Sequence, residues 1–110
     1  MTREHLTEIL SKHKLWLSGD PGGERACLSG ADLRDANLRG VDLDYSCWSL
    51  WCGSLGVVVD KRIFAQLAYH LARLTVDDEE CKAAQRVLAG LANQFRRVNE
   101  CGRIEIGDEK

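Results

Sequence analysis

Cysteine is the residue type in this sequence that could take part in the widest range of reactions. Thiols bind soft metals, form disulfides and act as nucleophiles, and the chain carries five of them, at Cys27, Cys47, Cys52, Cys81 and Cys101. No two form a Cys-x-x-Cys pair, and the three histidines form no His-x-x-x-His pair, so the usual zinc signatures are absent. We therefore predict reduced structural thiols and no bound metal. A thiol-based redox or metal module stays open as the least favoured function.

Carboxylates are the second group that could do chemistry. Asp32, Asp35, Asp42 and Asp44 lie close together in the sequence. The chain shows no nucleophile elbow, P-loop or kinase motif set that would supply the other parts of an active site. We therefore interpret these carboxylates as surface groups and predict no enzymatic activity, no catalytic residues and no cofactor.

Length and composition limit the class of protein further. The chain has 110 residues, of which 45% are hydrophobic, and this suits a single domain over residues 1–110. Its formal net charge of -2 predicts no direct sequence-specific binding of nucleic acid. No apolar run approaches the roughly 20 residues that cross a bilayer, and the first residues lack a signal-peptide pattern. We expect a cytoplasmic protein without a membrane partner.

A period of five residues organises the middle of the chain. Written from Ala26, the sequence reads ACLSG, ADLRD, ANLRG, VDLDY and SCWSL. The centre of each pentapeptide is a large apolar residue, and these residues are Leu28, Leu33, Leu38, Leu43 and Trp48. Neither a strand nor a helix places residues five apart on one face, so the pattern predicts a chain that turns a corner every five residues.

This pattern resembles the pentapeptide-repeat family, whose A(D/N)LXX motif is matched by residues 31–35 and 36–40. The resemblance covers residues 26–55 and implies an α+β fold with a short right-handed quadrilateral β-helix of about one and a half coils. In that geometry the central residues point inward and residues 20 apart stack. Cys27 is then expected beside Cys47, at about 4.8 Å, where an oxidant could join the thiols in vitro. Trp51 and Gly53 break the motif, so the coils should end there.

Helical patterns flank the repeats on both sides. Apolar spacing predicts an N-terminal helix over residues 1–18 and a helical hairpin over residues 60–98 that covers the open end of the coils, with a loose tail at 102–110. The second hairpin helix should run from the acidic residues 77–80 to Arg96 and Arg97. The residues expected to be buried by the hairpin are Ile63, Phe64, Leu67, Leu71, Leu74, Ala84, Val87, Leu88, Leu91 and Phe95.

The resemblance also implies a class of function, because pentapeptide-repeat proteins act through their surfaces and are generally not enzymes. Long acidic members imitate DNA, but residues 25–55 carry four acidic and three basic side chains, which argues against mimicry. The layout also looks like that of small phage-encoded members. We therefore predict a protein-binding module that inhibits a host or anti-phage defence complex acting on nucleic acid, such as a CRISPR-like complex. It would act in the host cytoplasm. A structural or scaffold protein is the alternative.

The predicted partner surface lies where the repeat pattern fails. Tyr45 is at an outward position, and Trp51 replaces a small residue. Aromatic and arginine side chains are the types most enriched in binding hot spots. The predicted partner-binding residues are Arg34, Arg39, Asp42, Asp44, Tyr45, Trp48 and Trp51. Three alternatives stay open. The tryptophans could be buried packing residues that cover the end of the coil, the protein could form a homodimer, or the partner could bind the hairpin around Arg62, Arg73 and Arg86.

Overall fold

The computed structural model describes residues 3–104, which belong to two compact units, Met1–Asp60 and Lys61–Lys110. We call these the N-terminal unit and the C-terminal unit. Most of the predicted tail, residues 105–110, lies outside the described residues. Within residues 3–104, no helix has the length and apolar character needed to cross a membrane.

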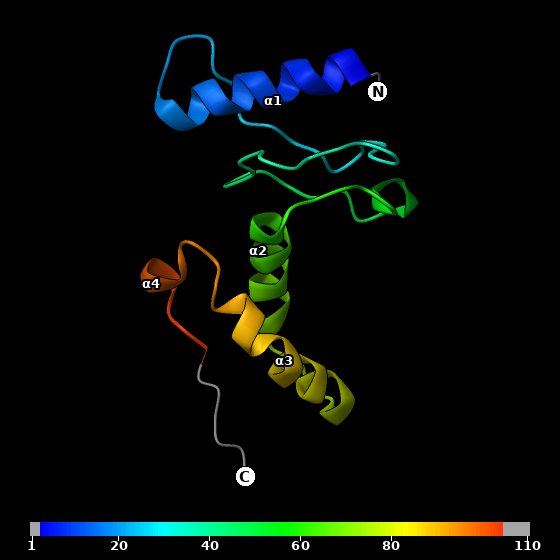
Figure 1. Cartoon of the computed structure of the whole chain (residues 1–110), viewed down its shortest axis with the longest axis vertical. Coiled ribbons are helices and arrows are strands. Elements are labelled where there is room, and N and C mark those ends of the chain that lie inside the picture. The colour runs from blue at the N-terminus through cyan, green and yellow to red at the C-terminus, as the bar shows by residue number, and fades with distance from the viewer. Residues whose placement is uncertain (1–2, 105–110) are drawn as a thin grey trace. The chain divides into compact units, whose positions relative to one another are not determined.

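Helices account for most of the regular structure in both units (Figure 1). The N-terminal unit contains α1 (Arg3–Ser18), the repeat turns and a short 3-10 helix, η1 (Cys52–Ser54). The C-terminal unit contains α2 (Lys61–Ala72), α3 (Glu79–Ala92) and α4 (Val98–Cys101).

The repeat segment does not form the predicted quadrilateral β-helix. Residues 3–104 contain no extended strand and no sheet, and the repeats are joined by two isolated parallel bridges, Cys27 with Cys47 and Asn37 with Val58. A chain that turns after every five residues leaves too few paired residues on each side for a continuous ladder. The predicted α+β class with a β-helix is therefore wrong, and the segment is a stack of turns.

Each of the first four pentapeptides turns at its central leucine. The carbonyl oxygens of these leucines accept hydrogen bonds from the N–H groups three residues later, at distances between 2.9 and 3.1 Å. The turns direct all four side chains inward, where each is buried. The inward position predicted for Leu28, Leu33, Leu38 and Leu43 is thus confirmed.

The second winding of the chain slips by one residue against the first. The N–H of Leu28 donates to the carbonyl of Cys47, 19 residues further along the chain. The N–H groups of Leu33 and Leu38 donate to Gly53 and Val58, each 20 residues further along. One extra residue is therefore accommodated between residues 47 and 53. Pairing then resumes, so the stacked turns continue beyond the predicted end at residue 55.

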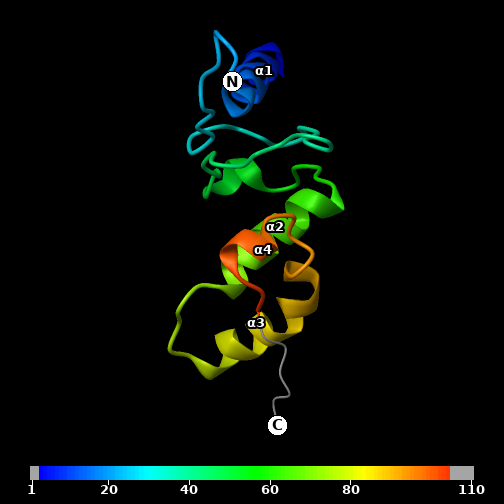
Figure 2. The same ribbon diagram turned by 90° about the vertical axis from the view of Figure 1, so that its left-hand side faces the viewer.

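Helix α1 lies along one side of the stacked turns in both views (Figures 1 and 2). Its inner face carries two buried residues, Leu6 and His13. The His13 ring contacts two different turns: its Nδ1 accepts from the N–H of Ala26 at 3.1 Å, and its Nε2 donates to the carbonyl of Asp44 at 2.9 Å. Polar contacts as well as apolar packing therefore hold α1 on the stack.

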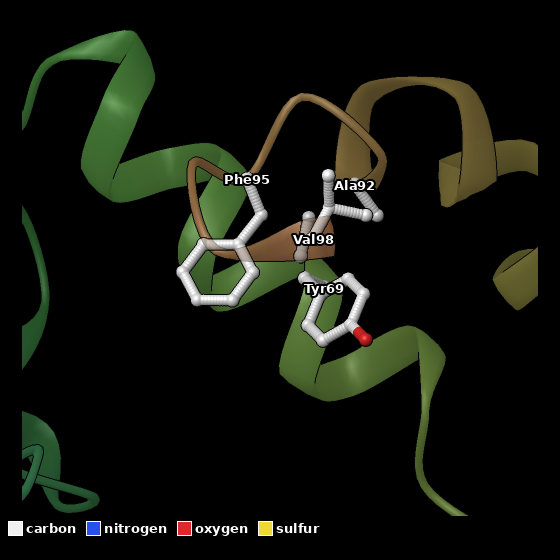
Figure 3. Close-up of a cluster of buried hydrophobic side chains, with 5 residues drawn as sticks. Tyr69, Ala92, Phe95 and Val98 are labelled. Carbon is white, nitrogen blue, oxygen red and sulfur yellow. The ribbon is translucent and has the colours of Figure 1, made fainter. Parts of the chain in front are cut away.

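The core of the C-terminal unit lies between α2, α3 and the segment that follows α3. Figure 3 shows Tyr69 from α2 meeting Ala92, Phe95 and Val98. The rings of Tyr69 and Phe95 lie 4.9 Å apart, and Ala68 completes the buried cluster. Two aromatic rings and small side chains therefore fill this core.

Helix α2 buries a different face from the one predicted. Ile63 is buried as expected, but the buried residues beside it are Ala65, Ala68 and Tyr69. The side chains that lie exposed instead are Phe64, Leu67, Leu71 and Leu74. Small alanines let two helices approach closely, and this favours the alanine face against α3.

Helix α3 begins near the predicted start but ends earlier than predicted. The Asp78 carboxylate caps it by accepting from the N–H of Cys81 at 2.9 Å. The helix ends at Ala92 because the buried Asn93 side chain pairs with the main chain of Ile104, at 2.8 and 2.9 Å. Phe95 is buried although it lies beyond the helix, while Ala84 and Val87 are exposed, which corrects the predicted buried stripe.

Candidate functional site

A polar side chain caps the turn in three successive repeats. The Oδ1 atoms of Asp32, Asn37 and Asp42 each accept a hydrogen bond from the N–H two residues later, at 3.2, 3.0 and 3.0 Å. Aspartate and asparagine both offer a short side chain with an acceptor oxygen at this position. The D/N position of the motif is therefore a structural cap as well as a surface position.

The first two capped turns also orient the two predicted arginines. Arg34 binds the Asp32 carboxylate through two hydrogen bonds, of 2.9 and 2.7 Å, and the Nε of Arg39 donates to Asn37 at 3.1 Å. The Arg34 guanidinium lowers the pKa of Asp32 from 3.8 to about 2. Both arginines are exposed, so the structure places them on the surface of neighbouring turns.

The predicted carboxylates Asp42 and Asp44 are less accessible than the arginines. Asp42 is half-buried, and Asp44 is only 4% exposed. The carbonyl of Asp44 receives the hydrogen bond from His13, so α1 lies against this turn. Asp44 is therefore not part of an accessible partner surface, contrary to the prediction.

Tyr45 is exposed as predicted and belongs to an aromatic cluster that the sequence did not reveal. It is 63% exposed and contacts Trp16 edge-on, with ring centroids 6.0 Å apart. The guanidinium of Arg25 lies 5.8 Å from the centre of the Trp16 ring, and His13 stacks on the same ring. We call Trp16, Arg25 and Tyr45 the Trp16 cluster. No local pattern joins these residues, because the contacts arise only when α1 packs on the turns.

The two tryptophans that end the repeats occupy the region of the one-residue slip. The Nε1 of Trp51 and the hydroxyl of Ser49 both donate to the carbonyl of Ala31, at 3.0 and 2.9 Å. A side chain on Gly53 would collide with the Trp51 ring, which explains why the large apolar residue of the motif is missing there. Trp51 remains 46% exposed and Trp48 is half-buried, so each combines a packing role with accessible surface.

A row of exposed apolar side chains lies on α2 and just beyond it. We call Phe64, Leu67, Leu71 and Leu74 the α2 stripe. Their exposed fractions are 50, 36, 51 and 60%. The sequence pattern located these residues but assigned them to the core. The alanines at positions 65, 68 and 72 are the signal that a second face of the helix could be buried.

The basic residues of the hairpin differ in accessibility. Arg73 donates to the Tyr69 hydroxyl and to the Gly102 carbonyl, at 2.7 and 2.9 Å, so it holds the end of the described chain against α2. Arg62 is half-buried and Arg86 is exposed. The structure therefore does not bring these arginines into one common site.

All five thiols are exposed and unlinked. The expected neighbours Cys27 and Cys47 are paired by a parallel bridge, and their Sγ atoms lie 2.7 Å apart. Within residues 3–104, no three metal-ligating side chains come together.

Comparison with known proteins bears on the repeats alone. Residues 24–47 match the family model described as pentapeptide repeats (8 copies). No curated protein and no solved structure matches the chain. The matched residues contain the leucine-centred turns and their caps, whereas the α2 stripe lies outside them.

Proposed function

Because residues 24–47 are pentapeptide repeats, we propose that this protein is a non-enzymatic protein-interaction module. The observation that carries the proposal is the α2 stripe, in which four large apolar side chains are between 36 and 60% exposed. Contiguous apolar surface on a small protein is typical of an interaction site. The α2 stripe is therefore the first candidate for the contact with a partner.

The spacing and charge of α2 favour an acidic amphipathic helix as the partner element. The stripe residues follow one another at intervals of three, four and three, which is the spacing along the seam between packed helices. Residues 61–73 carry Lys61, Arg62 and Arg73 and no acidic residue. A helix with an apolar face and carboxylates beside it would complement both features.

The finer proposal concerns the identity of the partner. We base it on the sequence layout alone, in which a short repeat segment between helical segments resembles small phage-encoded pentapeptide-repeat proteins. This similarity supports a partner in a host or anti-phage defence complex that acts on nucleic acid, with inhibition of that complex as the outcome.

A scaffold is the second candidate function, and a separate observation favours it. The N-terminal unit has accessible apolar side chains of its own, at Tyr45, Leu50, Trp51 and Leu55. A protein that joins two partners needs two such surfaces. The Trp16 cluster, which contains Tyr45, would be the second contact.

Site-directed crosslinking tests the α2 stripe as the contact surface. A photoreactive phenylalanine analogue is placed at Phe64, and the matched control carries it at Val87, a residue of α3 that is 84% exposed. We expect a specific adduct with a subunit of a nucleic-acid-acting complex from Phe64, and its loss when Leu71→Lys is added. Equal adducts from both positions, or no adduct from Phe64, would contradict the proposal.

The activity of the captured complex then distinguishes an inhibitor from a scaffold. Inhibition predicts that the protein lowers the nuclease or binding activity of that complex, and that Leu71→Lys restores the activity. A scaffold predicts unchanged activity and a second adduct from a photoreactive residue at Tyr45. An adduct between two copies of this chain would instead assign the stripe to a homodimer.

A further inference from the structure

The thiols of Cys27 and Cys47 form a close pair that the proposed protein-binding function does not involve. Their Sγ atoms lie 2.7 Å apart, and both side chains are exposed. The parallel bridge between the two residues holds their main chains in register. The fold therefore keeps two accessible thiols together without linking them.

Local contacts favour the thiolate form of Cys27. The Cys47 thiol donates to the Cys27 sulfur, and the Ser29 hydroxyl lies 3.3 Å from the same atom. Together with the charge of Arg25, these contacts lower the pKa of Cys27 from 9.0 to about 7, and the contact with Cys47 is the largest cause. The thiolate is the nucleophilic form of cysteine, so Cys27 is the attacking sulfur of the pair and Cys47 is the second one.

A groove lies directly beside Cys27. It has a volume of about 180 Å³ and is lined by α1 and by the chain that enters the first repeat. Lys12 and Arg25 contribute positive charge to its walls, and Glu8 and Glu24 contribute negative charge. Lys12 pairs with both acidic groups, at 3.7 Å from Glu8 and 4.0 Å from Glu24, and these long, partly exposed ion pairs are weak enough for a ligand that carries carboxylate and ammonium groups to replace them.

We propose that Cys27 and Cys47 form a thiol–disulfide exchange site for a small charged disulfide, such as oxidised glutathione, of which only a part lies in this groove. The Cys27 thiolate attacks one sulfur of the ligand, the ligand S–S bond breaks, and one half leaves as a thiolate that takes up a proton. Cys47 loses its proton to solvent and attacks the Cys27 sulfur. The mixed disulfide breaks, and the second half leaves as a thiolate that takes up a proton from solvent. Two protein thiols are thereby oxidised to one disulfide, and the ligand is reduced to two thiols.

Oxidation of the full-length protein tests the pair. The reduced protein is incubated with oxidised glutathione, quenched by alkylation and analysed by mass spectrometry. We expect the loss of two alkylatable thiols per chain and a disulfide between the peptides that contain Cys27 and Cys47. Cys47→Ser should stop the reaction at a glutathione adduct on Cys27, and Cys27→Ser should abolish it.

Cys52→Ser provides the matched control, because Cys52 is another exposed thiol of the same unit. This variant should react like the wild type. The proposal is overturned if Cys52, Cys81 and Cys101 are modified as fast as Cys27, or if Cys47→Ser acquires no adduct. A melting temperature measured for each variant shows that the comparison is made between folded proteins.

A comparison of a charged and an uncharged disulfide tests whether the groove binds the ligand. Lys12→Met removes one positive charge from the groove wall and leaves both thiols in place. We expect it to slow oxidation by glutathione disulfide about threefold, as for a partly exposed charge, and to leave the rate with uncharged hydroxyethyl disulfide unchanged. Equal slowing with both reagents, or no slowing with either, would remove the groove from the proposal. The rate should rise with pH around a midpoint near 7, which follows the thiolate of Cys27.

Discussion

His13 and Asp44 are joined by a buried hydrogen bond of 2.9 Å between the imidazole Nε2 and a main-chain carbonyl oxygen. The second ring nitrogen accepts from the N–H of Ala26, so the two contacts assign the proton of the ring to Nε2. A single side chain of α1 thus satisfies one donor and one acceptor from two different turns.

Replacement of His13 should strongly destabilise the protein. His13→Leu keeps an apolar side chain at the site but leaves the N–H of Ala26 and the carbonyl of Asp44 without this partner, at a cost of about 2 to 4 kcal/mol. Lys14→Leu introduces the same residue on the exposed side of α1 and should change stability by less than about 0.5 kcal/mol. Urea unfolding of both variants measures the difference, and equal stabilities would contradict the bridging role of His13.

Two glycines at the same position of different turns should respond differently to alanine. Gly40 has a φ of +79°, whereas Gly30 does not adopt this region, and an added Cβ meets no atom within 4 Å at either position. Gly40→Ala should therefore cost about 1 kcal/mol through backbone strain alone. Gly30→Ala should be neutral or stabilising by up to about 1 kcal/mol, because the unfolded chain loses freedom. Thermal melts that rank the two variants in the opposite order would contradict these turn conformations.

Substitutions on the exposed and the buried face of α2 should differ in their effect on the free energy of unfolding. Leu71→Ala should cost less than about 1 kcal/mol, whereas a buried leucine would cost about 2 to 5 kcal/mol. Ala68→Leu, on the buried face of α2, adds volume to the closed core and should cost about 1 to 3 kcal/mol. Denaturant unfolding decides between the faces, since a core-like loss at Leu71 would place the stripe inside the protein.

The pair between Asp32 and Arg34 should contribute to stability in a pH-dependent way. The pKa of Asp32 is lower in the folded chain, about 2 against 3.8, so the contribution is present above 3.8 and is lost as the pH falls through about 2. Asp32→Asn keeps the capping oxygen and removes the charge. Its stability should therefore fall below that of the wild type at about pH 6 and equal it at about pH 2.

The neighbouring repeat supplies the reciprocal variant for this test. Asn37→Asp places a carboxylate beside Arg39, which already donates to Asn37 in the same geometry. The variant should gain a pH-dependent contribution of the same sign as that of the Asp32 pair. Urea unfolding at the two pH values measures both variants, and a difference that persists at about pH 2 would show that the charge is not its cause.

Local sequence was sufficient to predict features that depend on local geometry. The repeated turn fixes the inward direction of Leu28 and Leu43 from a few neighbouring residues. The acidic residues 77–80 likewise marked the start of α3, which begins at Glu79 in the structure. The exposure of Tyr45 follows from its place in a turn.

Features that depend on distant contacts were not predictable in this way. Both faces of α2 are apolar in sequence, and the choice of the alanine face depends on Ala92 and Phe95, which lie far along the chain. The one-residue slip lies where the side chains of Ser49 and Trp51 donate to the carbonyl of Ala31, which is 18 and 20 residues away in the sequence. The prediction of a β-helix was wrong for a related reason. Repeat spacing specifies where the chain turns, but a β-ladder also requires several consecutive paired residues on each side.

The capped turns separate the electrostatics of the repeat surface from its architecture. Aspartate and asparagine offer the same acceptor oxygen to the main chain at positions 32, 37 and 42, and they differ in charge. Exchanges between these two residues can set the charge contributed by the three positions anywhere from zero to three negative units on one backbone. Single substitutions during evolution could therefore match the charge of this surface to a changing partner, while the hydrogen bonds that cap the turns stay in place.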